Sequence, residues 1–194
     1  MVLTTKLLLR AYSVGMFPMA VNARGTIGWF SPDPRGLLPL DEKFHIPHGL
    51  RRTLKRQRFT VTVDTEFPAV IRACAKTHGD TWISPQILRS YCQLHEEGHA
   101  HSVETRLEGR LVGGLYGVHL GGAFFGESMF HTETDASKVA LVALVERLRA
   151  RGFVLLDTQW ITPHLAQFGA FEVPRREYLG GLSAALQRSC SFHS

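Results

Sequence analysis

An acid and an amide follow an apolar run in the stretch GFVLLDTQWITPHL, residues 152–165. Residues 153–156 are all apolar and read as a buried strand, whereas Asp157 and Gln159 are polar. Burial of a carboxylate is costly unless it is hydrogen-bonded or paired, so this acid needs a partner. Side chains alternate along a strand, which puts Asp157 and Gln159 on one face, roughly 6.6 Å apart and within reach of a mutual hydrogen bond.

Such a pair can promote a reaction by positioning. Asp157 could hold the side-chain amide of Gln159 in one orientation and leave its carbonyl oxygen free to accept a proton or an N–H. A neutral glutamine is a poor base, so the contribution would be orientation and electrostatics more than proton abstraction. The alternative is a polar pair that ties down the next loop. Because an alanine at either position leaves no charge buried, both single alanine variants are expected to fold.

A second acid, Glu127, interrupts the apolar segment GAFFGESMF, residues 122–130. It follows a predicted strand end and precedes Met129 and Phe130. An acid among large apolar side chains suits the recognition of a cation or an amine. The alternative is an ion pair with Lys138 or a nearby arginine.

Residues 51–58, RRTLKRQR, contain five basic residues and no acid. Leu50 and Leu54 are four residues apart and mark the inner face of a predicted helix. The outer face or its margin then carries Arg51, Arg52, Lys55 and Arg56. Such a surface can contact several phosphates without reading a base sequence. A basic face that is merely solvated is the alternative.

Aromatic and histidine side chains are the remaining candidates. Four aromatic residues lie near the predicted ends of elements: Trp29, Phe30, Trp82 and Tyr91. Each could stack on a nucleobase, at roughly 1–3 kcal/mol per base, or simply pack in the core. His99 and His101 would share a strand face, but no convergent third ligand is evident, so we expect surface or cap histidines and no metal site.

The whole chain has the composition of an ordinary globular protein, with 194 residues of which 44% are hydrophobic and 20% charged. This length suffices for one core, or for a core and a small annex. The net charge of +5 suits a polyanionic partner. The three scattered cysteines form no CxxC pair, and the N-terminal segment has only a short apolar run. We therefore expect no disulfide framework, zinc finger, signal peptide or membrane span, and a cytoplasmic location.

The elements that must position these residues form an α+β pattern. Residues 59–64 alternate like a strand, and three later runs are joined by Glu-Gly and Gly-Gly turn dipeptides, which predicts an antiparallel meander. Helices are predicted over residues 84–98 and 135–151, each ended by a glycine. The strand that carries Gln159 follows the second helix. The pattern predicts a mainly antiparallel sheet with flanking helices.

Nine segments occur in order over nearly the whole chain: AYSVGMFPM, WFSPDPRGLLPLDEKFHIP, TWIS, LHEEGHAHSVE, LVGGLYGV, FFGESMF, DASKVAL, LLDTQ and GAFEVPRREYL. Together they resemble the leucyl/phenylalanyl-tRNA–protein transferase family. Members of this family move Leu or Phe from aminoacyl-tRNA to the α-amino group of proteins that begin with Arg or Lys, which tags these proteins for N-degron proteolysis. The resemblance implies a GNAT-like catalytic domain over residues 36–194, after a shortened N-terminal annex over residues 1–35.

The resemblance also implies a role for each candidate residue. Asp157 and Gln159 match the catalytic pair, and Glu127 matches an active-site acid near the acceptor peptide. Trp82 and Tyr91 match residues around the terminal adenosine of the tRNA. The apolar pocket for the donor side chain is matched by Leu115, Phe124, Leu141, Leu144, Leu148 and Leu156. The basic cluster that contacts the tRNA acceptor arm is matched by Arg52, Lys55 and Arg56.

An aminoacyl ester is already activated, so the implied reaction needs no ATP, metal, CoA or other cofactor. We expect Leu and Phe as donors, with Met as a further candidate of similar shape, and a monomer with no membrane partner. Two departures from the family bear on tRNA binding. Met19 stands where some members have a tryptophan, and His48 stands where one basic contact is an arginine.

Two other classes of protein remain as alternatives. A CoA-dependent acetyltransferase would share the fold, but its R/Q-x-x-G-x-G/A pyrophosphate loop is absent from the sequence. A non-catalytic RNA-binding protein would need only the basic residues and the aromatic ones. It would leave Glu127, Asp157 and Gln159 unexplained.

Overall fold

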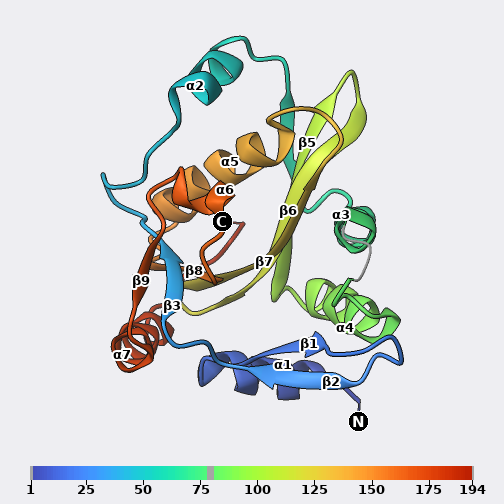
Figure 1. The fold of residues 1–194 in the computed structure, drawn as a ribbon, viewed down its shortest axis with the longest axis vertical. Helices are drawn as coiled ribbons and strands as arrows, with labels where there is room; N and C mark the ends of the chain where they lie inside the picture. The colour runs from blue at the N-terminus through green and yellow to red at the C-terminus, as the bar shows by residue number, and fades with distance from the viewer. Residues whose placement is uncertain (1, 78–80, 194) are drawn as a thin grey trace.

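The computed structural model describes residues 2–77 and 81–193, and a seven-stranded sheet lies at its centre (Figure 1). The strand order is β4-β5-β6-β7-β8-β3-β9, and all neighbouring pairs are antiparallel except β7 with β8, which is parallel. The bounds are β3 Arg35–Leu38, β4 Thr60–Val63, β5 Ala100–Leu107, β6 Arg110–Leu120, β7 Ala123–His131, β8 Leu155–Gln159 and β9 Phe171–Val173, with β1 Phe17–Ala20 and β2 Ile27–Phe30 in a separate pair. The predicted meander is confirmed as β5, β6 and β7. Its first turn, at Glu108 and Gly109, uses the two positive φ angles, 51° and 78°, that a tight hairpin requires.

Helices cover both faces of this sheet (Figure 1). α5 (Ala136–Ala150) packs on one face, whereas α3 (Phe67–Thr77) and α4 (Pro85–Glu96) pack on the other. Successive residues of β6 therefore enter different cores, with Leu115 beside α5 and Tyr116 beside α3 and α4. The remaining helices are α1 Thr5–Ser13, α2 His48–Lys55, α6 Pro163–Ala166 and α7 Arg175–Leu186.

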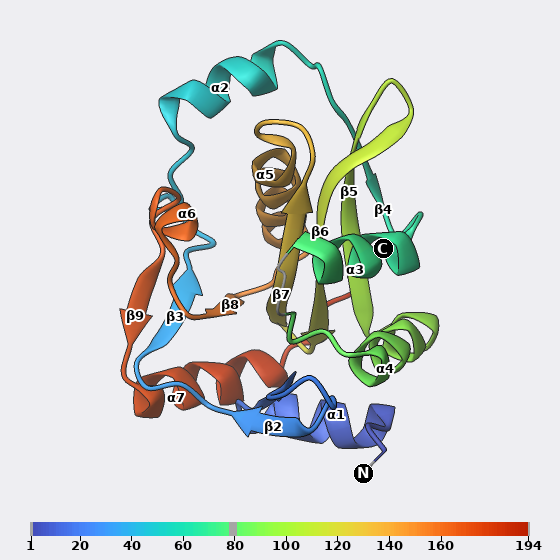
Figure 2. The ribbon, with the colours of Figure 1, turned by 45° about the vertical axis from the view of Figure 1, so that its right-hand side comes forward.

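The parallel strands β7 and β8 pair only at their first three positions. Beyond these positions they separate (Figure 2), so residues 126–131 and 158–159 border an opening in the sheet. β3 pairs with the other side of β8, where Gly36 faces Gln159. A Cβ atom at Gly36 would lie 2.8 Å from the carbonyl carbon of Trp160, so glycine at this position lets the end of β8 approach β3 closely.

The N-terminal segment packs into the same core as the rest of the described chain. Tyr12 of α1 and Phe17 of β1 belong to one buried cluster with Tyr91 of α4. Trp29 and Phe30 pack against that cluster, which is the second of the two roles that the sequence leaves open for them. None of the helices within the described ranges is long and apolar enough to cross a membrane.

Candidate active site

A cavity of about 520 Å³ lies where β7 and β8 separate. The ends of the two strands supply a polar part of its wall, and the sheet and α5 supply a largely apolar part. Seven residues that the sequence singles out line this cavity: Trp82, Leu115, Glu127, Leu141, Leu144, Leu156 and Gln159. The fold thus brings together five separate parts of the chain: the segment before α4, β6, β7, α5 and β8.

Asp157 lies behind the wall, in an ion pair with Arg35 of β3 in which neither residue is exposed. The guanidinium donates from Nη2 to Oδ2 at 2.6 Å and from Nε to Oδ1 at 2.9 Å. The hydroxyl of Tyr178 donates to Oδ2 at 2.7 Å, and the backbone N–H of Gln159 donates to Oδ1 at 2.9 Å. The expected hydrogen bond between the side chains of Asp157 and Gln159 is therefore wrong, because the carboxylate holds the backbone of Gln159.

Gln159 ends β8 in the left-handed region, with a φ of 59°. A side-chain-bearing residue in this region is strained by about 1–3 kcal/mol, so its surroundings must impose the conformation. The hydrogen bond to Asp157 and the pairing with Gly36 do so. The side chain lines the cavity, where its Nε2 donates to Oε1 of Glu127 at 3.3 Å. The side-chain amide of Gln159 is therefore oriented by Glu127 and not, as the sequence predicts, by the carboxylate of Asp157.

Glu127 is held by two tyrosine hydroxyls from outside its own strand. Tyr12 donates to Oε1 at 2.6 Å, Tyr91 lies 3.4 Å from Oε2, and the two hydroxyls also hydrogen-bond to each other. Burial raises the pKa of Glu127 to about 7; the nearby negative charge of Asp157 also raises it, whereas the tyrosine hydrogen bonds lower it. Glu127 therefore changes its charge near neutral pH.

This raised pKa predicts a pH-dependent contribution of Glu127 to stability. The folded state holds its proton up to about pH 7, whereas the ordinary value is 4.5, so between these values the folded state binds more protons than the unfolded state. As the pH rises through this window, the free energy of unfolding of the wild type should therefore fall relative to that of Glu127→Gln, in which residue 127 does not titrate. Urea titrations of both proteins from pH 4 to pH 8 measure the difference. Parallel stability curves would contradict the prediction.

Some of the sequence-based candidates lie outside the cavity wall: Tyr91, Phe124, Leu148 and Asp157. Phe124 and Leu148 are fully buried in the core around α5, so they back the wall and do not line it. The alternative ion pair between Glu127 and Lys138 is not formed, because the ammonium of Lys138 lies 3.0 Å from Asp135.

Several residues of the site were not predicted from the sequence. Asp157 is bound by Arg35 and Tyr178, and Glu127 is bound by Tyr12. Only Arg35 had a signal in the sequence, since it lies in the segment SPDPRG. Three further cavity residues each have a buried polar atom that finds no partner within the described chain: Tyr116 (Oη), Thr158 (Oγ1) and His164 (Nε2).

Three exposed basic residues lie on α2 or just after it: Arg52, Lys55 and Arg56. Within the described residues, none of their side chains forms an ion pair or a hydrogen bond. The hydroxyl of Thr53 donates to Asp135 at 2.9 Å, which ties α2 to the start of α5, two residues from the cavity residue Ser137. The basic surface therefore stands near the cavity, at the upper edge of the molecule in Figure 1.

The chain is similar to proteins of one known family over nearly its whole length. The family model for leucyl/phenylalanyl-tRNA protein transferase matches residues 37–183, and the model for the N-terminal domain of that family matches residues 1–33. A leucyl/phenylalanyl-tRNA–protein transferase of Akkermansia muciniphila is 57% identical over 187 residues, which cover 95% of this chain and 97% of that protein. One of Herpetosiphon aurantiacus is 55% identical over 190 residues, which cover 98% of each chain.

The fold is also shared with a solved structure of low sequence identity. The crystal structure of FemX superposes with a TM-score of 0.56 and 11% identity, over 88% of this chain and 66% of that one. The α+β, GNAT-like fold class with a mainly antiparallel sheet is confirmed. From the two family models and the curated relatives together, this chain belongs to the leucyl/phenylalanyl-tRNA–protein transferase family.

Proposed function

We propose that this protein transfers Leu or Phe, with Met as a further donor, from aminoacyl-tRNA to proteins that begin with Arg or Lys, and so tags them for N-degron proteolysis. Membership of the family supports the type of reaction. The observation that carries the site is the contact between Glu127 and Gln159 in the wall of a largely apolar cavity. We further propose that it acts as a monomer in the cytoplasm.

The apolar part of the cavity is proposed to hold the donor side chain. Leu115, Leu141, Leu144 and Leu156 line this part and offer no charge to a bound amino acid. A pocket of this kind selects Leu and Phe by shape and by loss of apolar surface from water. Trp82, which also lines the cavity, is half-buried and could stack on the terminal adenosine.

The polar part is proposed to hold the acceptor amine against the ester carbonyl. The free carbonyl oxygen of Gln159 accepts an N–H of the neutral amine, and ionised Glu127 attracts the cationic first residue of the acceptor. The new C–N bond forms, the ester C–O bond breaks, and the proton lost by the amine ends on the ribose oxygen of the departing tRNA. Asp157 is proposed as a positioning residue that acts through the backbone of Gln159.

Transfer of labelled Leu tests this function directly. Purified protein, Leu-tRNA and a peptide with N-terminal Arg should yield a Leu-Arg peptide, and the same peptide with N-terminal Ala should react poorly. Acetyl-CoA with the same peptides serves as the control for an acetyltransferase. Acetylation without leucylation, or no transfer at all by folded protein, would refute the proposal.

The exposed basic surface on α2 is predicted to bind tRNA phosphates. Replacing Arg52, Lys55 and Arg56 by Ala should raise the apparent KM for aminoacyl-tRNA. The logarithm of the affinity falls linearly with the logarithm of the salt concentration, and each lost phosphate contact makes this line shallower by roughly 0.7–0.9. The slope of the triple variant should therefore be shallower by about 2–3. Transfer from a minimal aminoacyl-adenosine donor should barely change. An unchanged salt slope with full-length tRNA would show that the surface is merely solvated.

The donor pocket is predicted to respond to added volume at Leu141. In Leu141→Phe, the larger ring takes up cavity space and should lower kcat/KM for Phe-tRNA roughly tenfold more than for Leu-tRNA. Leu148→Phe is the matched control, because Leu148 lies two turns further along α5 and outside the cavity wall. This control should lose stability by overpacking while the ratio of the two donors stays constant. Equal losses for both donors in Leu141→Phe would make Leu141 a core residue only.

A further inference from the structure

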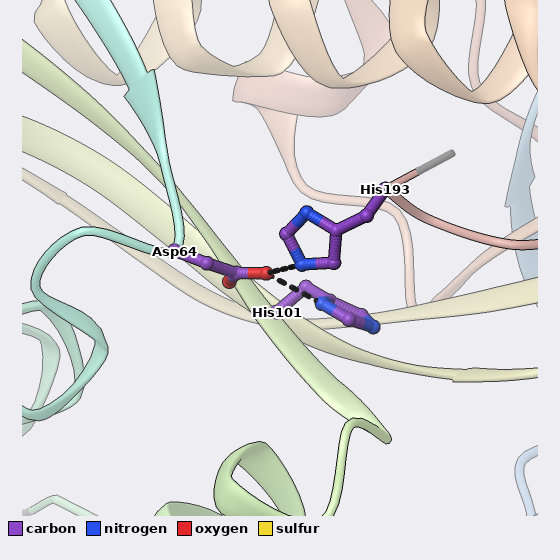
Figure 3. Close-up of side chains that lie close together, drawn as sticks. All are labelled: Asp64, His101 and His193. Atoms are coloured by element: carbon purple, nitrogen blue, oxygen red, sulfur yellow. Dashed lines mark hydrogen bonds and ion pairs between the residues drawn. The ribbon is translucent and has the colours of Figure 1, made fainter.

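Three side chains far apart in the sequence converge at the edge of the sheet, away from the cavity (Figure 3). Oδ2 of Asp64 lies 2.7 Å from Nδ1 of His101 and 2.6 Å from Nε2 of His193. Asp64 directly follows β4, His101 lies on β5, and His193 lies in the segment after α7. The expectation that His101 is a surface or cap histidine without converging ligands is therefore wrong, because its side chain is only 3% exposed and two possible ligands meet it.

The surroundings hold two of these side chains firmly. The backbone N–H of Ser102 donates to the other carboxylate oxygen of Asp64 at 2.7 Å. Nε2 of His101 lies 2.8 Å from Nδ1 of His119, and the ring of His101 stacks on that of Phe192 with centroids 4.1 Å apart. Histidines that bind metals typically use one ring nitrogen as ligand while the other is held by a hydrogen bond, as here.

We propose that Asp64, His101 and His193 bind one divalent transition-metal ion of the zinc class. The three ligand atoms lie within 4.8 Å of one another, and two imidazoles with one carboxylate suit Zn²⁺ better than the oxygen-preferring Mg²⁺ or Ca²⁺. The ion would replace the protons that the imidazoles now share with the carboxylate, and water would complete its coordination. His193 is 55% exposed, which gives the ion a path from solvent.

This site would serve stability rather than the transfer reaction. None of the three residues lines the cavity. Phe192, next to His193, is buried in the core and stacks on Phe124, so the segment that carries His193 is already packed against the sheet. An ion that joins this segment to β4 and β5 would fasten it further, because a ligand that binds only the folded state raises its stability.

Zinc titration of tag-free protein, first stripped of metal with EDTA, tests the proposal. The wild type should bind one Zn²⁺ per chain and gain several degrees in Tm when ZnCl₂ is added. Asp64→Asn and His193→Ala should bind at least about 10–100-fold more weakly and lose the gain in Tm. His193→Ala should still fold, since His193 is exposed. His45→Ala removes an exposed histidine elsewhere and should bind like the wild type.

A spectroscopic readout separates a built site from scattered surface binding. Co²⁺ in place of Zn²⁺ should give the visible absorption of a low-coordinate site in the wild type and in His45→Ala, and should lose it in His193→Ala. Equal zinc affinity in the wild type and His193→Ala, or no stoichiometric binding by the folded wild type, would overturn the proposal and leave the three residues as a hydrogen-bonded cluster.

Discussion

Asp157→Ala is expected to lower the free energy of unfolding by about 3–5 kcal/mol, because it strands the charge of Arg35 in the core. Both partners are fully buried, and the guanidinium has Asp157 as its only carboxylate partner among the described residues. The change also removes the acceptor for Tyr178 and for the backbone of Gln159. Melting curves should show a drop in Tm of about 10 °C or more.

Two further variants show whether the buried charge is the cause. Glu133→Ala breaks the exposed ion pair with Arg58 and should cost less than about 1 kcal/mol. Replacing Arg35 and Asp157 together by leucine removes both charges and should recover part of the stability that Asp157→Ala loses. A wild-type Tm for Asp157→Ala would contradict this account. The expectation from sequence that this variant folds because no charge is left buried overlooked Arg35.

Gln159→Ala is expected to lower the rate of transfer by about 10²–10³-fold while the protein stays folded. The loss arises because no carbonyl oxygen remains to accept the N–H of the attacking amine. Single-turnover transfer with saturating aminoacyl-tRNA and Arg-peptide measures this rate without product release. A rate equal to that of the wild type would show that Gln159 is not a catalytic residue.

The strained backbone of Gln159 supplies the matched control. Gln159→Gly also lacks the amide, but glycine adopts a φ of 59° without strain, so this variant should be more stable than Gln159→Ala. Equal loss of rate in both variants would assign the effect to the side chain. Because Glu127 orients the amide, the rate losses of Glu127→Gln and Gln159→Ala should not add when the two changes are combined.

The local features of the fold follow from neighbouring residues in the sequence. Ser84 caps α4 by accepting the N–H of Ile87, and Pro85 begins the helix, as the residue types require. Alternating runs and glycine-containing turns sufficed for the meander, because a hairpin turn and a strand period depend on neighbouring residues. The polar residues of the site were also visible, since Glu127 and Gln159 stand out in apolar segments.

The partners of those polar residues depend on how distant elements pack together. Arg35 reaches Asp157 across 122 positions because β3 enters the sheet beside β8. Tyr12 reaches Glu127 across 115 positions because the ring of Tyr12 packs on Phe125 of β7. A strand pattern places a side chain on a face but does not name the element that covers that face. For this reason the sequence predicted a hydrogen bond between the side chains of Asp157 and Gln159. In the folded chain, Asp157 pairs with Arg35, and the amide of Gln159 donates to Glu127.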